Sequence, residues 1–227
     1  MFTLNDKEIN NIKVKLAIMS QLMSGMFNDA VNSLFNNDRD QAKAIIKQDE
    51  QVDALETEIE GLCLRFLALY APKAFELRYV VAVTRLTNDI ERIADHSTVI
   101  CREVLTHHFR SVQTFHPKIS QMTEMCSRVL GEAVDSFFDL NDEKFKQIFG
   151  TDKSIGEIQK SINSDLTNFI SRDPDSALET ISLINIVRRL ERVADHAKNI
   201  AVMVPYITQG KLLRHSPEAL TDADTVD

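Results

Sequence analysis

The sequence predicts an all-α protein made of two tandem, antiparallel three-helix bundles, with six long helices in total. Apolar residues recur in steps of three and four along almost the whole chain, which is the helical period. Gly (6) and Pro (5) are scarce among 227 residues, and this favours a few long elements over many short strands. The second half also repeats the first, so each half is expected to be one bundle.

The first three helices are expected at residues 5–36, 39–70 and 73–108. Asn36-Asn37-Asp38 breaks the first pair, and Ala71-Pro72 breaks the second with proline at a helix start. Alternating steps of three and four are typical of near-parallel helices in a bundle. The expected core stripes are Ile9, Ile12, Leu16, Met19, Met23, Met26 and Ala30; Ile45, Val52, Leu55, Ile59, Leu62, Phe66 and Leu69; and Val83, Leu86, Ile90, Ile93, Ser97, Ile100 and Val104.

The last three helices are expected at residues 117–140, 142–171 and 175–209. His116-Pro117 should open the fourth helix, Leu140-Asn141-Asp142 should end it, and Asp173-Pro174 should separate the fifth from the sixth. We therefore predict bundle repeats at 1–110 and 111–210. Residues 211–227 form an acidic tail that we expect to be mobile.

Two pairs of similar segments, which occur in the same order in both halves, are the evidence for the repeat. The segment 31–36 (Val-Asn-Ser-Leu-Phe-Asn) resembles 134–139 (Val-Asp-Ser-Phe-Phe-Asp). Glu-Arg-Ile-Ala-Asp-His at 91–96 resembles Glu-Arg-Val-Ala-Asp-His at 191–196, with five of six positions identical. The offset is 103 residues at the first match and 100 at the second, so the second copy should have a shorter connection before its last helix.

Composition excludes several classes of function. The net charge is −8 and there is no block of Lys or Arg, so no nucleic-acid interface is expected. No signal peptide is visible and the apolar runs are too short to span a bilayer, which predicts a cytoplasmic protein that reaches membranes only through partners. Cys63, Cys101 and Cys126 are far apart and show no ligand spacing, so we expect buried thiols in a reducing compartment.

Acidic pairs accompany the first copy of the repeated segment. On a helical wheel Glu91 and Asp95 lie almost opposite the core stripe, and Asp49 and Asp53 have the same spacing on the preceding helix. If the two helices pack in register, these four carboxylates form a surface cluster. Either the cluster is a solvated face with ion pairs to residues such as Arg92, or it holds a hard cation such as Mg, Mn, Ca or iron.

The second copy has a less complete set of acids. Asp152 takes the place of Asp49, but Gly156 takes the place of Asp53, with Glu157 one step along; Glu191 and Asp195 complete the set. Unequal metal affinity between the halves is therefore expected. His96 and His196 each lie about 100° round the helix from the neighbouring Asp. We expect packing or supporting roles for these rings rather than metal ligation.

The chain resembles the PhoU family of bacterial phosphate-transport regulators over about residues 6–210. The resemblance is carried by Leu69-Tyr-Ala-Pro, by Glu76-Leu-Arg78, and by the longer motifs at 89–96 and 189–201. It implies metal ions, reported as iron, zinc, manganese or magnesium, on the acidic motifs. The implied metal positions are Asp49, Asp53, Glu91, Asp95, Asp152, Glu191 and Asp195.

The resemblance also implies a function. PhoU-like proteins are not known as enzymes, and no catalytic residue is expected here. They act as negative regulators of phosphate uptake and of phosphate-starvation two-component signalling, as adaptors between the ATPase subunit of the phosphate importer and a sensor histidine kinase. Family members often form homodimers, and we expect the same.

Two other functions stay open at this point. One is a PhoU-like accessory protein of a single-component phosphate permease, which the sequence distinguishes poorly from the first reading. The other is a metal-dependent hydrolase that uses the carboxylate clusters. The hydrolase is disfavoured because a cluster on an outer helix face lacks a concave, water-excluding pocket.

Overall fold

A computed structural model describes residues 4–211, except for the side chains of residues 4–6, 142–146 and 149–153. Within this range the chain forms helices and no strands, as predicted. The elements are α1 (Leu4–Asn36), α2 (Arg39–Tyr70), α3 (Ala74–Thr106), α4 (Val112–Asp139), α5 (Asp142–Arg172), a 3₁₀ helix η1 (Pro174–Ser176) and α6 (Ala177–Gln209). The predicted mobile tail lies outside the described residues, apart from Lys211.

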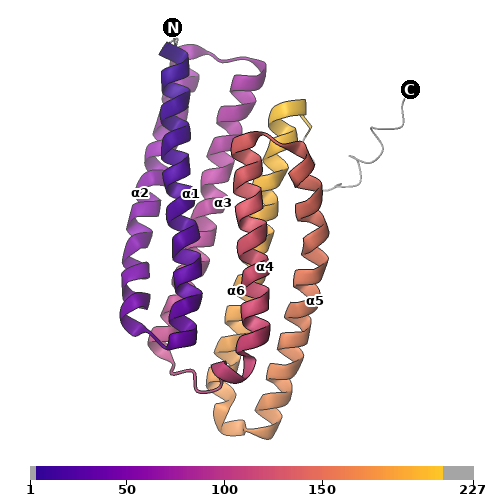
Figure 1. Cartoon of the computed structure of the whole chain (residues 1–227). Helices are drawn as coiled ribbons and strands as arrows, with labels where there is room; N and C mark the ends of the chain where they lie inside the picture. The colour runs from indigo at the N-terminus through magenta and orange to yellow at the C-terminus, as the bar shows by residue number, and fades with distance from the viewer. Residues whose placement is uncertain (1–3, 212–227) are drawn as a thin grey trace, which may run out of the picture.

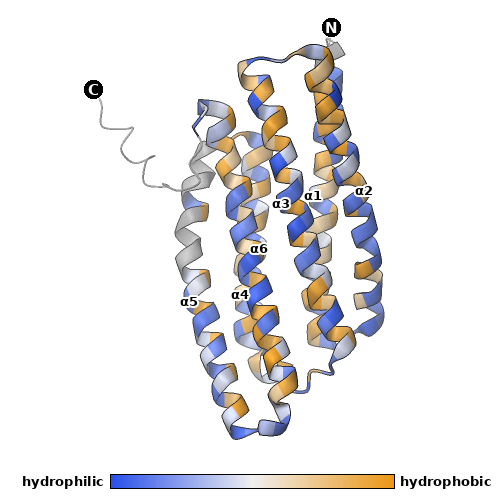
Figure 2. Ribbon diagram, turned by 180° about the vertical axis from the view of Figure 1, so that it is seen from behind, coloured by the Kyte–Doolittle hydropathy of each residue, from blue (hydrophilic) through white to orange (hydrophobic). Residues whose placement is uncertain are grey.

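The two halves run in opposite directions (Figure 1). The turn between α2 and α3 lies at the same end as the N-terminus, whereas the turn between α5 and α6 lies at the other end. Seen from behind, α3 and α6 run side by side in the middle, and α2 and α5 lie on the outer flanks (Figure 2). The last helix of each half, which carries the repeated segment, therefore forms the contact between the halves.

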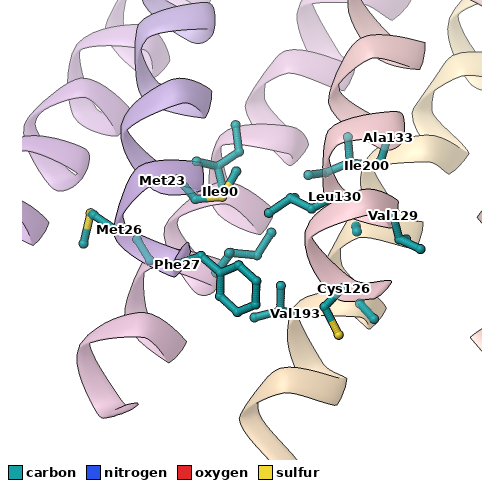
Figure 3. Close-up of a cluster of buried hydrophobic side chains, with 14 of the residues drawn as sticks. Met23, Met26, Phe27, Ile90, Cys126, Val129, Leu130, Ala133, Val193 and Ile200 are labelled. Carbon is teal, nitrogen blue, oxygen red and sulfur yellow. The ribbon is translucent and has the colours of Figure 1, made fainter. Parts of the chain in front are cut away.

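Apolar side chains of both halves form one continuous core. Figure 3 shows Met23 and Phe27 of α1 opposite Leu130 of α4, with Ile90 and Val193 from α3 and α6 beside them. The predicted core stripes are confirmed at most positions. Three of their members, Ile9, Leu55 and Leu62, are only partly buried. Leu69, in the last turn of α2, is 64% exposed, so its place in the stripe was predicted wrongly.

The start of the fourth helix was predicted wrongly. Helix α4 begins at Val112, five residues before Pro117, which lies inside the helix. Val112 is fully buried. The Glu179 carboxylate accepts hydrogen bonds from the backbone N–H groups of Arg110 (2.8 Å) and Ser111 (3.2 Å). This cap comes from the first turn of α6, far along the chain, so local signals could not show it. The other helix boundaries lie within two residues of those predicted.

Two connections matter for the site. Only Asp173 separates α5 from η1, which leads directly into α6, whereas residues 71–73 join α2 to α3. Counted to the start of α6, the connection of the second copy is residues 173–176, so the expectation of a shorter connection there is wrong. Residues 107–111 link the halves, and Asn37 holds this linker: Phe109 N–H donates to Asn37 Oδ1 (2.9 Å), and Asn37 Nδ2 donates to the Phe109 carbonyl (3.2 Å).

Among the described residues, no helix combines the length and apolar character needed to cross a bilayer.

Candidate functional site

The acidic pairs of α2 and α3 lie close enough to interact. Asp49 is half-buried, and burial, followed by the charges of Asp53 and Asp95, raises its pKa to about 6. Arg102 on α3 opposes this rise. The pKa of Asp49 is thus raised by an acid on its own helix, Asp53, and by one on the next helix, Asp95. The register expected between the two helices therefore brings these carboxylates together.

Glu91 is more buried than the helical wheel predicted. Only 18% of its side chain is exposed, against 41% for Asp95, because α2 and α6 flank α3 and leave it a narrow outer face. Burial, then Asp95, raises the pKa of Glu91 to about 7; Glu56 adds to the rise and Arg92 opposes it. Glu91 Oε2 is shielded from solvent and accepts no hydrogen bond; the Arg92 guanidinium Nε lies 3.4 Å away.

This chemistry fits a hard cation, although the site is not preformed. Carboxylates that raise one another's pKa bind either protons or a cation, and an all-oxygen donor set suits Mg, Mn, Ca or iron better than zinc. In the described part of the chain, however, no three His, Cys, Asp or Glu side chains converge on one point. Side chains would have to rotate to enclose a metal. Arg92 meanwhile pairs with Asp95 at 3.3 Å, which is the ion pairing of a solvated face.

Acids of the second half have different surroundings. Lys198 Nζ lies 2.8 Å from Asp195 Oδ1, so a cation of the protein already neutralises this carboxylate. Burial raises the pKa of the Cys126 thiol to about 12, and Glu191 and Asp195 add to that rise, which locates both acids near α4. A Cβ on Gly156 would meet no atom within 4 Å, so packing does not require glycine there.

The remaining acids of the second half, Glu157 and Asp152, belong to α5. Glu157 is exposed on α5. Asp152 belongs to α5, but its side chain lies outside the described set. The structure thus places the predicted carboxylates of the first half near one another, without three of them converging, and the described side chains of the second half give no equivalent group.

Both motif histidines lie at the contact between the halves. Their ring centroids are 5.5 Å apart. His196 Nδ1 donates to Asp89 Oδ1 (2.8 Å), which also accepts from Asn199 Nδ2 (3.1 Å), and Asp89 is only 7% exposed. Burial lowers the pKa of His96 to about 4, and the charges of His196 and Arg189 act in the same direction.

Asp89 was missed as a functional residue in the sequence. One signal could have found it: the repeat is nearly identical around this position, yet the second copy has Arg189 where the first has Asp89. A change of charge sign inside a duplicated segment marks a position where the two copies differ in role. Here His196 has a carboxylate partner, whereas His96 has an arginine nearby.

Cys63, Cys101 and Cys126 are buried and unpaired, as expected. Burial raises the pKa of each thiol to about 12. A thiol with such a pKa is not a nucleophile at neutral pH, because the thiolate is the reactive form.

Comparison with known proteins gives consistent results. The family model described as "PhoU domain" matches residues 16–104 and again residues 119–204. The chain is 28% identical over 210 residues to the phosphate-specific transport system accessory protein PhoU homolog of Pseudomonas aeruginosa, covering 92% of this chain and 86% of the relative. It is 24% identical over 208 residues to the corresponding accessory protein of Escherichia coli, with the same coverage.

Solved structures show the same fold. The crystal structure of PhoU from Pseudomonas aeruginosa superposes with a TM-score of 0.84 at 26% sequence identity, covering 91% of this chain and 99% of that chain. The two segments that match the family model fall within α1–α3 and α4–α6.

Proposed function

The chain belongs to the PhoU family, the accessory proteins of phosphate-specific transport systems, and we propose that it is a negative regulator of phosphate uptake and of phosphate-starvation two-component signalling. The observation that carries the proposal is the match of both halves to the family model, together with the doubled Glu-Arg-x-Ala-Asp-His segment. In this role the protein links the ATPase subunit of a phosphate importer to a sensor histidine kinase in the cytoplasm, and it reaches the membrane only through them.

An adaptor role agrees with the chemistry of the described residues. The three thiols are buried with raised pKa values, and the acidic cluster lies at the surface between two helices rather than in an enclosed pocket. Apolar side chains are exposed near the turn between α2 and α3: Leu69 is 64% exposed, Phe75 44% and Leu77 41%. Exposed apolar residues grouped at one end suit contact with another protein. We accordingly propose a non-enzymatic protein.

Metal binding forms part of the proposal. Asp49, Asp53, Glu91 and Asp95 would hold a hard cation in the first half, where Glu91 Oε2 is shielded from solvent and accepts no hydrogen bond among the described residues. The ion would supply positive charge that neutralises the repelling carboxylates and ties α2 to α3. In the second half Asp152, Glu191 and Asp195 are the candidates for a weaker site.

Gene deletion tests the regulatory role. A strain without the gene should express a phosphate-regulated promoter in high phosphate, and the wild-type gene should restore repression. Repression that stays unchanged in the deletion strain would overturn the proposal. If the deletion altered uptake only through a single-component phosphate permease, with the importer and the kinase unaffected, the accessory role for such a permease would replace it.

Physical association gives an independent readout. Cross-linking in cells should recover the importer ATPase subunit and the kinase with this protein. Light scattering of the purified chain should show a homodimer, and a strict monomer with and without metal would remove the dimer from the proposal.

A further inference from the structure

We propose that a cleft between α3 and α6 binds a phosphate group, either as free inorganic phosphate or as the terminal group of a small phosphate monoester. The cleft has a volume of about 680 Å³ and lies on the side of the α3–α6 contact where Asp89 meets His196. Its lining residues are Thr84, Arg85, Asn88, Asp89, Arg92, His196 and Asn199. The volume exceeds what a phosphate ion needs and is in the range that holds small organic ligands.

The lining is rich in hydrogen-bond donors. Arg85 and Arg92 line the cleft with guanidinium groups beside the carboxylate of Asp89, and Arg92 also pairs with Asp95 (3.3 Å) outside the cleft lining, so Arg85 is the main cationic donor. Asn88 and Asn199 add amide donors. Guanidinium groups present paired N–H donors that match the oxygens of a tetrahedral oxyanion, which makes phosphate a better match than a carboxylic acid or a neutral ligand.

Arg85 provides the strongest single indication. Its Nη1 is shielded from solvent and has no hydrogen-bond acceptor among the residues that the structure describes. The guanidinium carbon lies 5.5 Å from the centroid of the Tyr206 ring, so the ring holds the charged group at the cleft. A shielded, charged N–H without an acceptor is unfavourable. A bound anion would supply the missing acceptor once the Arg85 side chain turns this N–H toward the cleft.

Asp89 fixes the site and gives it selectivity. Its Oδ1 accepts from His196 Nδ1 and Asn199 Nδ2, which ties the α6 wall of the cleft to the α3 wall. A carboxylate next to the ligand tolerates phosphate, which can carry a proton and donate it in a hydrogen bond. Sulfate has no such proton at neutral pH, and two unprotonated anions repel each other. The site should therefore prefer phosphate to sulfate.

The duplication has not produced the same set twice. At the repeat offset, the counterparts of Thr84, Arg85 and Asn199 are Ile184, Asn185 and Val99. One phosphate group per chain is therefore expected. This inference does not rest on the proposed regulatory function. If the cleft bound no phosphate, the protein could still regulate uptake by sensing phosphate through its partners.

Calorimetric titration of the full chain, freed of metal with a chelator, tests the site. Inorganic phosphate, glycerol 3-phosphate and sulfate are compared at constant ionic strength. We expect saturable binding of one or both phosphate ligands at one per chain, with sulfate about tenfold weaker or more. The stronger of the two phosphate ligands identifies the source. Absence of saturable binding by either, or equal binding of sulfate, would overturn the assignment.

Two matched variants locate the binding. Arg85→Gln should weaken phosphate binding about tenfold or more, because a charged hydrogen bond is lost. Arg188→Gln makes the same change of charge at an exposed position of α6 outside the cleft and should leave the affinity unchanged. Equal losses in the two variants would show general electrostatics and refute the site. Asp89→Asn should narrow the preference for phosphate over sulfate; an unaltered preference would contradict the role given to Asp89.

A measurement on the unmodified chain covers the case in which a variant fails to fold. Phosphate should shift the imidazole NMR resonances of His196, which lines the cleft. It should not shift those of His116, whose ring lies 4.1 Å from the Phe35 ring elsewhere in the fold. Equal shifts at both histidines, or none at His196, would refute the proposal.

Discussion

The two halves share one motif but surround its carboxylates differently. In the first half, burial and then neighbouring acids raise the pKa of Asp49 and of Glu91, and Glu91 Oε2 accepts no hydrogen bond among the described residues. In the second half, Lys198 neutralises Asp195, and glycine stands at position 156 where the first half has Asp53. Duplication has kept the helix packing in both halves, while the charge environment has diverged. The first half is therefore the better candidate for a cation.

A second difference lies at the contact between the halves. His196 pairs with Asp89, whereas His96 lies near Arg189, the counterpart of Asp89. Two identical histidines in equivalent places thus have opposite electrostatic surroundings. Five measurements test these differences between the halves.

The largest effect is expected from the shared core. Phe27→Ala should lower the free energy of unfolding by about 3–5 kcal/mol, because a fully buried ring is replaced by a cavity. Since the core is continuous, chemical denaturation should show one transition for the whole chain. Leu64→Ala, at a side chain that is 59% exposed, should change stability by less than about 0.5 kcal/mol. Two separate transitions would show that the halves fold independently.

Metal affinity should fall most when an acid of the first half is removed. Asp95→Asn should weaken Mn²⁺ binding about thirtyfold, or about 2 kcal/mol, because a charged oxygen ligand is lost from the more complete cluster. Asp195→Asn is the matched change in the second half, where Lys198 lies closer to the carboxylate (2.8 Å) than Arg92 lies to Asp95 (3.3 Å) and Gly156 replaces one acid. Its effect should be smaller. Calorimetric titration checks both, and equal losses would contradict the difference between the halves.

The second half should gain affinity when its missing acid is restored. Gly156→Asp adds a carboxylate where a Cβ meets no atom within 4 Å, so it should fold normally and strengthen Mn²⁺ binding about tenfold. Gly156→Asn provides the uncharged control. If aspartate and asparagine gave the same affinity, position 156 would have no part in a metal site.

His96 should make stability rise with pH. Its folded pKa is about 4, below the ordinary value of 6.5, so between these values the unfolded chain binds more protons than the folded one. Stability from this group increases across that window, by about 1 kcal/mol once screening by water is allowed for. His96→Gln should flatten the rise in denaturation experiments at pH 4 to 6.5. His116→Gln serves as the control, and an unaltered slope in His96→Gln would contradict the assigned environment.

Glu91 should act with the opposite sign and the smallest magnitude. Its folded pKa is about 7, above the ordinary 4.5, so the folded chain binds more protons between these values and loses stability as pH rises. Screening limits the loss to below about 1 kcal/mol. In metal-free protein, Glu91→Gln should remove this loss. Adding Mn²⁺ to the wild type at pH 7 should offset it, and a variant with the same pH slope as wild type would refute the assignment.

Much of the fold could be predicted because local signals determine it. The steps of three and four, the scarce prolines and the repeat fixed six helices with most boundaries to within two residues. The start of α4 could not be predicted, because the hydrogen bonds that fix it come from Glu179 in α6, far along the chain. Pro117 does lie in α4, but it does not mark the start of the helix. The helix begins five residues earlier, at Val112, whose side chain is fully buried.

The sequence pointed to the acidic residues of the candidate site, but it did not predict their burial or their hydrogen-bond partners. A helical wheel placed Glu91 away from the core stripe but could not show how far its neighbours shield it, because the burial of a side chain depends on contacts with other helices. Asp89 was likewise not recognised as the partner of His196, because that contact joins residues 107 positions apart. Exposure and partners of a polar residue depend on tertiary contacts that one helix does not encode.

The linker at residues 107–111 has a mechanical consequence. Asn37, in the α1–α2 turn, forms two hydrogen bonds with the Phe109 backbone, and Glu179, at the start of α6, accepts hydrogen bonds from the backbone N–H groups of Arg110 and Ser111. A strap fastened on both sides cannot act as a hinge. With the continuous core, these hydrogen bonds favour movement of the two bundles as one body. In the proposed regulatory role, contact at one end of the protein would then displace the other end as well.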